Sequence, residues 1–256
     1  MCGQGLLPSF HDATPIGPWT ETARRGQWRQ CAGRSRTTAW QELTSVAKQA
    51  NTGAEHFLPD RSGMSDIAAL RAAAADCQGC DLYRDATQAV FGEGGADARY
   101  VFVGEQPGDQ EDRQGHPFVG PAGRVLDRAI AEAGIERDTV YLTNAVKHFK
   151  FTYKGKRRIH QKPSAAEVSA CAPWLDAELR LLHPEVTVIL GATAARALLG
   201  PSFRLTQHRG EPMPHGETTL VATVHPSAVL RAPDRDEAYQ EFLSDLMVAA
   251  REGVTR

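Results

Sequence analysis

The sequence predicts an α/β protein, a three-layer α/β/α sandwich built on a four-stranded parallel sheet. The chain has 256 residues, of which 41% are hydrophobic, and this is enough for a sizeable core. Four short apolar segments are continuous and rich in β-branched residues, as in strands buried on both faces, and helical patterns separate them. The four segments are Tyr100–Val103, Val140–Leu142, Val186–Leu190 and Leu220–Val224.

Residues 1–63 differ in composition from the rest of the chain. They contain three of the four tryptophans, scattered glycine and proline, and no sustained apolar repeat. We expect a largely irregular extension over residues 1–63, apart from a short helix near Trp40–Ala50. A domain of residues 64–256 follows, and its first helix, SDIAALRAAAADC, is expected to be capped by Ser65.

The helices between the expected strands have recognisable ends. The segment PAGRVLDRAIAEAG stops at Gly134, a residue type that commonly follows helices. Ser164 and Glu167 form a capping box at the start of AAEVSACAPWLDAELRLL. Two further helices are expected at Ala192–Leu199 and Glu237–Ala250. Because strands and helices alternate, a ligand is expected beyond the carboxyl ends of the strands.

Charge and cysteine content exclude several classes of protein. The formal net charge of −2 excludes a globally basic nucleic-acid coat protein, although it allows a local basic patch. No segment approaches the roughly 18 apolar residues of a membrane span, and the N-terminus lacks the features of a secretory signal. We therefore expect a cytoplasmic protein without membrane contact, whose five cysteines are thiols, metal ligands or nucleophiles rather than disulfides.

Two of the cysteines form the motif Cys77-Gln78-Gly79-Cys80, whose spacing suits two ligands of one metal. A thioredoxin-type redox pair is the alternative, but no strand precedes this motif. Cys171 and His148 are candidates for the remaining ligands, whereas Cys2 and Cys31 are expected to be bystanders. Three thiolates and an imidazole suit zinc as well as an iron–sulfur cluster, and the spacing leaves this choice open.

Polar motifs follow three of the expected strands at their carboxyl ends. Gly104-Glu105-Gln106-Pro107-Gly108 follows the first strand, Thr143-Asn144 the second and His225-Pro226-Ser227 the fourth. The glycines let the backbone approach a ligand, and the Glu-Gln pair can activate or orient a water. The first motif is not a P-loop, because no GK[ST] follows it. Since the strands are expected to be parallel, all three motifs lie on the same edge of the sheet.

A basic segment follows the second motif. Six cations fall within twelve residues, with aromatic and histidine side chains between them. Such a charge run is usually a solvated loop, but this mixture also suits phosphate contacts and base stacking. The cations are Lys147, Lys150, Lys154, Lys156, Arg157 and Arg158, and the side chains interleaved with or next to them are His148, Phe149, Phe151, Tyr153 and His160.

Together these motifs resemble the iron–sulfur branch, family four, of the uracil-DNA glycosylase superfamily. The resemblance rests on CQGC, VFVGEQPGDQEDRQGHPFVGPAG, VYLTNAVK and VATVHPSAVLR, in this order, and runs from about Met64 to the C-terminus. Two departures narrow it, since Gln106 stands where ordinary members have the alanine of GEAPG, and those members lack the basic insert Gly155–Gln161. Both features resemble the UdgX-type subgroup, whose members become covalently joined to the DNA they process.

The resemblance implies how uracil is bound and released. The nucleotide is flipped out of the base stack into the pocket at the sheet edge. Phe118 stacks on the uracil ring, Asn144 hydrogen-bonds to its pairing edge, and Gly104 and Gln106 complete the pocket. His225 donates to the departing uracilate oxygen and stabilises its charge.

The resemblance also implies a covalent end to the reaction. His160 attacks C1′ of the sugar in place of water, so each protein acts once and stays attached. Glu105 orients or deprotonates His160, Arg158 holds the loop of His160, and Gln106 positions a water or the sugar. The expected DNA contacts are Lys147, Lys156, Arg157, Arg158, Ser227 and Arg231.

For the metal, the resemblance favours a [4Fe–4S] cluster. Ordinary members supply four cysteines, and His148 stands at the position of the third. The implied ligands are Cys77, Cys80, His148 and Cys171, with an external fourth ligand as the alternative to His148. The expected partner is uracil-containing DNA, preferably single-stranded, and the protein is expected to be a monomer.

Two alternatives compete with this interpretation. An ordinary multiple-turnover uracil-DNA glycosylase would share the insert but hydrolyse its product. A non-catalytic metal-containing protein would bind single-stranded DNA through residues 147–158. The histidine in KRRIH argues against the first alternative. The polar motifs at the strand ends argue against the second, because a protein that only binds DNA does not need them.

Overall fold

The computed structural model of the chain describes residues 53–60 and 66–254. The helix expected near Trp40–Ala50, the expected cap Ser65, and Cys2 and Cys31 lie outside these residues. Among the described residues, no helix combines the length and the hydropathy needed to cross a membrane.

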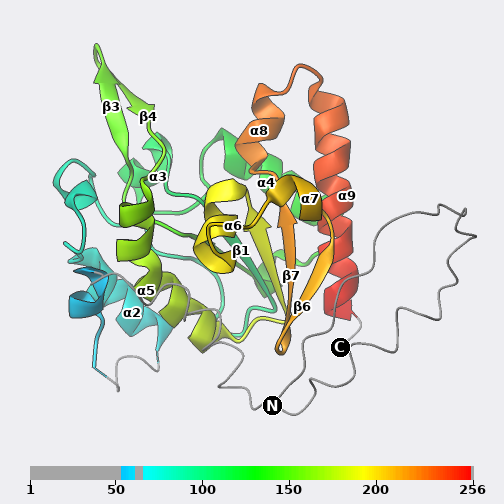
Figure 1. Ribbon diagram of the computed structural model, residues 1–256, viewed down its shortest axis with the longest axis horizontal. Helices are drawn as coiled ribbons and strands as arrows, with labels where there is room; N and C mark the ends of the chain where they lie inside the picture. The colour runs from blue at the N-terminus through cyan, green and yellow to red at the C-terminus, as the bar shows by residue number, and fades with distance from the viewer. Residues whose placement is uncertain (1–52, 61–65, 255–256) are drawn as a thin grey trace, which may run out of the picture. The chain divides into compact units, whose positions relative to one another are not determined.

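A five-stranded sheet forms the middle layer, with strand order β2-β1-β5-β7-β6 (Figure 1). Four of the strands are parallel to one another, as the sequence predicts, and every residue in them is buried. Burial on both faces explains their continuous apolar sequences. These strands are β1 (Tyr100–Gly104), β2 (Val140–Asn144), β5 (Val186–Leu190) and β7 (Thr218–Thr223).

The fifth strand is not among those that the sequence predicts. β6 (Pro212–His215) pairs antiparallel with β7 at the edge of the sheet. Proline has no N–H to donate, so Pro212 and Pro214 fit a strand only where one side is unpaired, and they hide the strand pattern in the sequence. The predicted four-stranded parallel sheet is therefore corrected to a mixed sheet of five strands.

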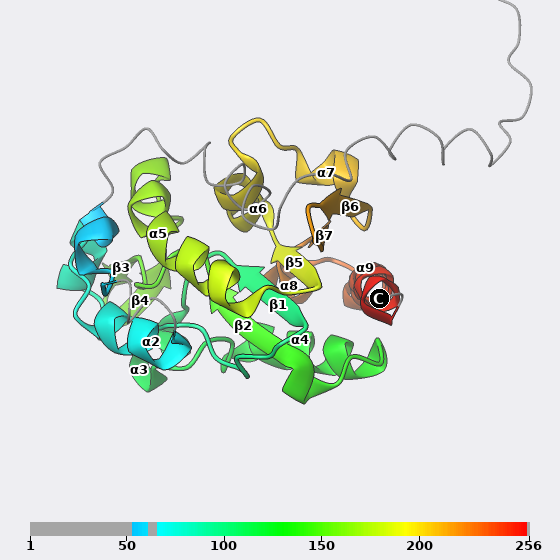
Figure 2. The same ribbon diagram turned by 90° about the horizontal axis from the view of Figure 1, so that it is seen from below.

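Helices cover both faces of this sheet, which confirms the three-layer sandwich (Figure 2). Side chains of α4, α8 and α9 pack on the face that contains Phe102, and those of α5 and α6 pack on the face that contains Val103. The helices that follow β1 are α3 (Asp109–Gln114), α4 (Pro121–Glu132), η6 (Arg137–Thr139), α5 (Ala165–Leu182), α6 (Ala192–Leu199), α7 (Leu205–His208), α8 (Pro226–Arg231) and α9 (Arg235–Val254).

Three short helices precede the sheet, and α5 lies against two of them. They are η3 (Gly53–Phe57), α2 (Ile67–Ala75) and η5 (Asp81–Arg84). Ala54 of η3 is buried in the same apolar cluster as Cys77 and Cys171. η3 therefore contributes to this cluster from ahead of residue 64, and the domain boundary expected there stays a prediction.

The helix ends follow local sequence signals closely. The capping box of α5 is confirmed, since the Ser164 hydroxyl and the Glu167 carboxylate each accept the other's backbone N–H. Gly134 lies just beyond α4 with a φ of 75°. The cap of α2 is Asp66 instead of the predicted Ser65, because the Asp66 carboxylate accepts a backbone N–H of the first turn.

The basic segment contains a two-stranded hairpin. β3 (Phe151–Lys154) pairs antiparallel with β4 (Arg157–His160), and Gly155 in the turn has a positive φ of 62°. The hairpin projects from the end of the molecule toward which the parallel strands point, above α3 (Figure 1). His160 is its last residue and pairs with Phe151 at the base.

Candidate active site

A pocket of about 660 Å³ lies at the carboxyl ends of the parallel strands. Its lining comes from the loop after β1, the end of β2, α3, the start of α4, the end of β4, and α8. Eight of the predicted site residues meet here. They are Glu105, Gln106, Phe118, Asn144, His160, His225, Ser227 and Arg231.

Asn144 and Phe118 lie against the backbone of Gly104. A Cβ atom at Gly104 would overlap Asn144 Oδ1 and the Phe118 ring, so a side chain would displace both. Phe118 itself has a φ of 59°, a strained conformation that the surrounding structure must hold in place. Gly123 leaves room for the Phe118 carbonyl in this turn. The Phe118 ring thus lies 6.2 Å from the His225 ring, with an interplanar angle of 27°.

His225 caps α8, and the first turn of that helix orients its ring. Nδ1 accepts the backbone N–H of Ser227 at 3.2 Å and lies 2.8 Å from the Ser227 hydroxyl. Because Nδ1 is an acceptor, the neutral ring carries its hydrogen on Nε2. Burial lowers the pKa of His225 to about 4, and Arg231 and His160 contribute to this shift. His225 is therefore neutral at pH 7.

Glu105 and His160 form the second functional pair. Glu105 Oε1 lies 3.5 Å from His160 Nε2, and Glu105 Oε2 accepts a hydrogen bond from the Thr193 hydroxyl. Burial lowers the pKa of His160, while Glu105 opposes this shift and Arg231 adds to it. The pocket thus places a neutral imidazole beside a carboxylate.

Gln106 lines the pocket, but its amide is engaged elsewhere. Nε2 donates to the carbonyls of Lys150 and Gln161 at 3.2 and 3.0 Å, and Oε1 accepts the N–H of Lys150 at 3.2 Å. Both chain segments at the base of the hairpin are therefore bound by this side chain. Both amide hydrogens are thus donated to the backbone, and the expected role of Gln106 in positioning a water or the sugar stays a prediction.

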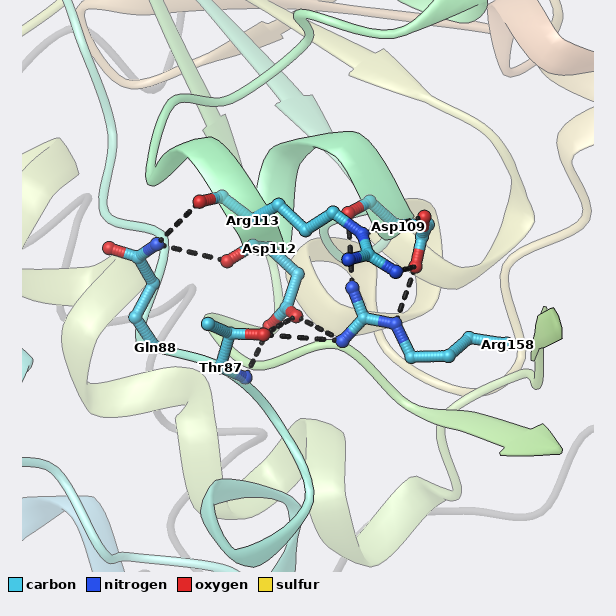
Figure 3. Close-up of polar contacts among 6 residues, drawn as sticks. All are labelled: Thr87, Gln88, Asp109, Asp112, Arg113 and Arg158. Carbon is cyan, nitrogen blue, oxygen red and sulfur yellow. Dashed lines mark hydrogen bonds and ion pairs between the residues drawn. The ribbon is translucent and has the colours of Figure 1, made fainter. Parts of the chain in front are cut away.

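Arg158 joins the hairpin to α3 (Figure 3). Its Nε donates to Asp109 at 2.5 Å and its Nη1 to Asp112 at 2.6 Å. Asp112 is fully buried and also accepts hydrogen bonds from the backbone and hydroxyl of Thr87. Arg158 thus connects the strand that ends at His160 to α3. Its side chain is only 8% exposed, so the predicted contact with DNA phosphates is corrected to an internal ion pair.

Lys147 was also expected to contact DNA, and the structure contradicts this. Its side chain is 0% exposed, and Nζ lies 2.5 Å from the equally buried Glu178 carboxylate. Nζ also donates to the Thr143 hydroxyl at 2.7 Å and to the Asn144 carbonyl at 2.9 Å. A buried ammonium requires such partners. Lys147 therefore supports Asn144 from within the protein and cannot reach a phosphate.

The other predicted DNA contacts lie on accessible parts of the chain. Lys156 and Arg157 are exposed at the tip of the hairpin. Ser227 and Arg231 line the pocket from α8. These residues are placed where a bound strand could reach them, and their contact with DNA stays a prediction.

The three described cysteines belong to one apolar cluster, and all are free thiols. Cys77 Sγ accepts the indole N–H of Trp174, and Cys171 Sγ accepts the backbone N–H of Lys147, both at 3.2 Å. Such hydrogen bonds are typical of the sulfur ligands of iron–sulfur clusters, and two buried thiols with a partly buried third suit this group chemically. In the described part of the chain, however, no three His, Cys, Asp or Glu side chains are arranged to hold a single metal ion.

His148, the predicted fourth ligand, is also buried. Burial lowers its pKa, and the charge of Asp112 opposes this shift. A neutral imidazole is the form that binds metals. The assignment of His148 as a ligand stays a prediction.

Several side chains that hold the predicted site residues were not apparent in the sequence. For one group, the sequence contains a local signal. Two aspartates three residues apart on α3 place two carboxylates on one side of a helix, where they can bind a cation. The others act over long separations, 31 residues for the Lys147 pair and 88 for the Glu105 pair. The missed residues form three groups. Asp109 and Asp112 bind Arg158. Glu178 binds Lys147, and Thr193 binds Glu105.

The fold and the pocket together define the class of this protein. A carboxylate, two neutral imidazoles, an amide and an aromatic ring meet beyond the carboxyl ends of parallel strands, which equips an α/β enzyme for acid–base or nucleophilic chemistry on a flat polar ligand. The chain belongs to the uracil DNA glycosylase superfamily, whose family model matches residues 91–247. The matched range contains the whole sheet and every residue that lines the pocket.

Similar proteins of known name agree with this assignment. The chain is 40% identical over 157 residues to the type-4 uracil-DNA glycosylase of Thermotoga maritima, which covers 60% of this chain and 78% of that protein. It is 33% identical over 187 residues to the type-4 uracil-DNA glycosylase of Sulfurisphaera tokodaii, and the match covers 70% of this chain and 82% of that protein. A type-5 uracil-DNA glycosylase of Thermus thermophilus is 35% identical over 144 residues, and the match covers 50% of this chain and 60% of that protein.

Proposed function

We propose that this protein excises uracil from DNA and then joins its own His160 to C1′ of the abasic sugar. The observation that carries the proposal is the Glu105–His160 pair, which lies in the same pocket as Asn144 and His225. The family membership and the type-4 relatives support the excision step. The covalent step rests on the resemblance to the UdgX-type subgroup and on this pair.

Asn144 and Phe118 select uracil in the proposed reaction. The Asn144 amide offers both a donor and an acceptor, which match O4 and N3–H of uracil, whereas cytosine presents the opposite pattern. The Phe118 ring supplies a flat surface for the flipped base beside Gly104. Lys147 and Glu178 keep the Asn144 backbone in place from inside the protein.

His225 assists the departure of uracil. The N1–C1′ bond breaks with its electron pair going to uracil, which leaves as an anion, and the sugar becomes an oxocarbenium ion. A neutral His225 with its hydrogen on Nε2 can donate to a uracilate oxygen without having to be protonated first. The charge of the anion is stabilised as it develops.

His160 then captures the sugar cation. A ring-nitrogen lone pair forms the N–C1′ bond, and the ring gives up its remaining N–H proton to become a neutral alkylimidazole. The Glu105 carboxylate stabilises the positive charge on the sugar and on the ring, and it accepts this proton. Water remains excluded from C1′ while the imidazole occupies that side.

We further propose that Cys77, Cys80 and Cys171, with His148 as the fourth ligand, hold a [4Fe–4S] cluster. The three thiols of one apolar cluster, with N–H donors to the sulfurs of the two buried ones, support this proposal, as does the resemblance to the type-4 enzymes. The group would supply covalent cross-linking between the segment of Cys77 and Cys80 and helix α5, and no step of the reaction passes through it.

A denaturing gel tests the proposed function. Wild-type protein is incubated with a uracil-containing single-stranded oligonucleotide, and uracil release is measured in the same samples. We expect a protein–DNA species that survives boiling, together with one uracil released per protein. His160→Ala should release uracil without forming this species. A gel without any adduct in the wild type, with uracil released over many turnovers, would identify an ordinary glycosylase instead. No release at all would contradict both.

A further inference from the structure

The two oxygens of the Glu105 carboxylate have different neighbours. Oε1 lies 3.5 Å from His160 Nε2, and Oε2 accepts the hydrogen bond of the Thr193 hydroxyl. Thr193 is the second residue of α6, is 6% exposed, and is not among the residues that line the active-site pocket. The sequence patterns that led to the other site residues do not include it.

We propose that Thr193 is a positioning residue for the covalent step, because its hydroxyl holds Oε2 of Glu105 and thereby keeps Oε1 turned toward His160. This role rests on the proposed function of His160, because Thr193 orients Glu105, the partner of His160.

The geometry explains why Glu105 needs such a contact. The terminal torsion of a glutamate side chain has a broad energy profile, so the carboxylate rotates easily unless something binds it. The separation of 3.5 Å from His160 is too long for a strong hydrogen bond, and it does not orient the carboxylate by itself. The Thr193 hydroxyl is the better-defined partner.

Thr193 is well suited to this task. A β-branched side chain in a helix has few accessible rotamers, so its hydroxyl is a rigid donor. Its place in the first turn of α6 also puts the carboxylate at the end of a helix where negative charge is stabilised. Both effects favour one orientation of the Glu105 carboxylate.

The contact acts on the adduct step in particular. In the described structure, the hydrogen bonds of Asn144 and His225 do not involve Thr193. Loss of the Thr193 hydroxyl should therefore slow the capture of the sugar by His160 more than the release of uracil. It should also change the titration of His160, which is faced by Glu105 from the loop after β1 and by Arg231 and His225 from α8.

The test compares Thr193→Val, which keeps the shape and removes the hydroxyl, with Thr193→Ser, which keeps the hydroxyl. Thr187→Val is the matched control, since the Thr187 hydroxyl is buried in β5 without a hydrogen-bond partner in the described structure. Uracil release and adduct formation are followed in the same single-turnover reactions. Thermal unfolding checks each variant, and Thr193→Ala provides a second protein without the hydroxyl.

We expect Thr193→Val to form the adduct about ten- to a hundredfold more slowly, the range for one hydrogen bond to a charged group, and to release uracil at nearly the wild-type rate. Thr193→Ser and Thr187→Val should behave as wild type. In protein without DNA, the His160 titration followed by NMR should move to lower pH in Thr193→Val, because a rotated carboxylate stabilises the imidazolium less well.

Three results would overturn the inference. They are adduct formation at the wild-type rate in Thr193→Val and Thr193→Ala, an equal slowing of release and adduct formation, and failure of Thr193→Ser to restore the rate. A wild-type protein that releases uracil but never forms an adduct would refute the proposed function itself, and this outcome is visible in the same gels.

Discussion

Partial removal from water keeps both imidazoles of the pocket neutral. It is the chief cause of the lowered pKa of His160 and of His225, and Arg231 lowers both further. In the proposed reaction, neutrality has a different use in each case, because His225 would donate from Nε2 whereas His160 would attack with a lone pair that protonation removes. The same burial makes the folded protein sensitive to acid, since each ring takes up a proton more easily after unfolding.

Replacing His225 with Gln should reduce this sensitivity. The pKa of His225 is about 4 in the folded protein and about 6.5 in an unfolded chain, so stability is lost as the pH falls through this range. From about pH 7 to pH 5, His225 accounts for a loss of about 2 kcal/mol in the free energy of unfolding. Urea unfolding of both proteins at each pH measures this. Equal losses in wild type and His225→Gln would contradict a neutral His225 ring in the folded protein.

The lysines Lys147 and Lys156 should respond to substitution in opposite ways. Lys147→Met leaves the buried Glu178 carboxylate without its cation, which should cost about 3 kcal/mol or more of unfolding free energy. Lys156→Ala should leave stability unchanged and lower the slope of log K against log salt by about 0.7, the share of one phosphate on a single strand.

Denaturant unfolding and binding titrations on uracil-free single-stranded DNA measure these effects without any reaction intervening. The salt dependence of binding by Lys147→Met should equal that of the wild type. A reduced slope in Lys147→Met, or a destabilised Lys156→Ala, would mean that the two side chains have been placed incorrectly.

The difference between these two lysines shows what could be predicted for single residues. The basic segment was recognised from its composition, and the side chains that face the pocket were recognised from motifs at the strand ends. Within the segment, however, Lys147 and Lys156 look alike. Glu178, which lies 31 residues away on another element, makes burial of Lys147 possible. Local composition contains no information about that partner.

At the scale of elements, the β3–β4 hairpin carries the proposed nucleophile, and contacts at its base hold it. Gln106 binds the backbone on both sides of the base, and Arg158 binds Asp109 and Asp112 on α3. A two-stranded hairpin is only marginally stable by itself. The position of His160 therefore depends on these contacts.

Arg158→Ala should loosen the hairpin. The change removes the cation from the fully buried Asp112, and a loss of about 3 kcal/mol corresponds to roughly a hundredfold faster amide exchange in residues 151–160. Arg157→Ala is the matched control, because the neighbouring Arg157 is exposed. Hydrogen exchange followed by mass spectrometry compares the three proteins. Unchanged protection of the hairpin in Arg158→Ala would contradict the role of the ion pairs.

The parallel strands and the α5 capping box were predicted because their signals are local. Continuous apolar runs indicate strands buried on both faces, and a serine three residues before a glutamate indicates a helix start. The hairpin and β6 were missed for two different reasons. The hairpin has exposed, charged strands, and β6 contains two prolines, so neither shows the apolar pattern of a buried strand.

At the scale of the whole molecule, one residue links the pocket to the apolar cluster that contains the three described cysteines. The Lys147 backbone N–H donates to Cys171 Sγ, while its side chain donates to the Asn144 carbonyl. The same apolar cluster also joins the segments of η3 and α2 to α5. We therefore expect the region that precedes the sheet to depend on the proposed metal for part of its stability, whereas the sheet has its own two apolar cores.

Removal of the proposed cluster by oxidation and chelation should therefore act on one part of the protein. We expect proteases to cleave more readily within residues 66–90, while the sheet and its covering helices stay protected. Limited proteolysis with mass spectrometry identifies the sites, and Cys171→Ala should reproduce the pattern without chemical treatment. Identical digestion before and after removal of iron, or protein purified without iron, would contradict this prediction.

Local sequence patterns by themselves determined the α/β class, the four parallel strands, the shared edge for three polar motifs and the basic segment. Each of these depends on residues a few positions apart. Only the tertiary structure decided that Lys147 is buried, that Gln106 and Arg158 hold a hairpin, and that Thr193 holds Glu105. These roles depend on partners 31 to 88 residues away, and the energy of such a pair depends on how far folding removes it from water.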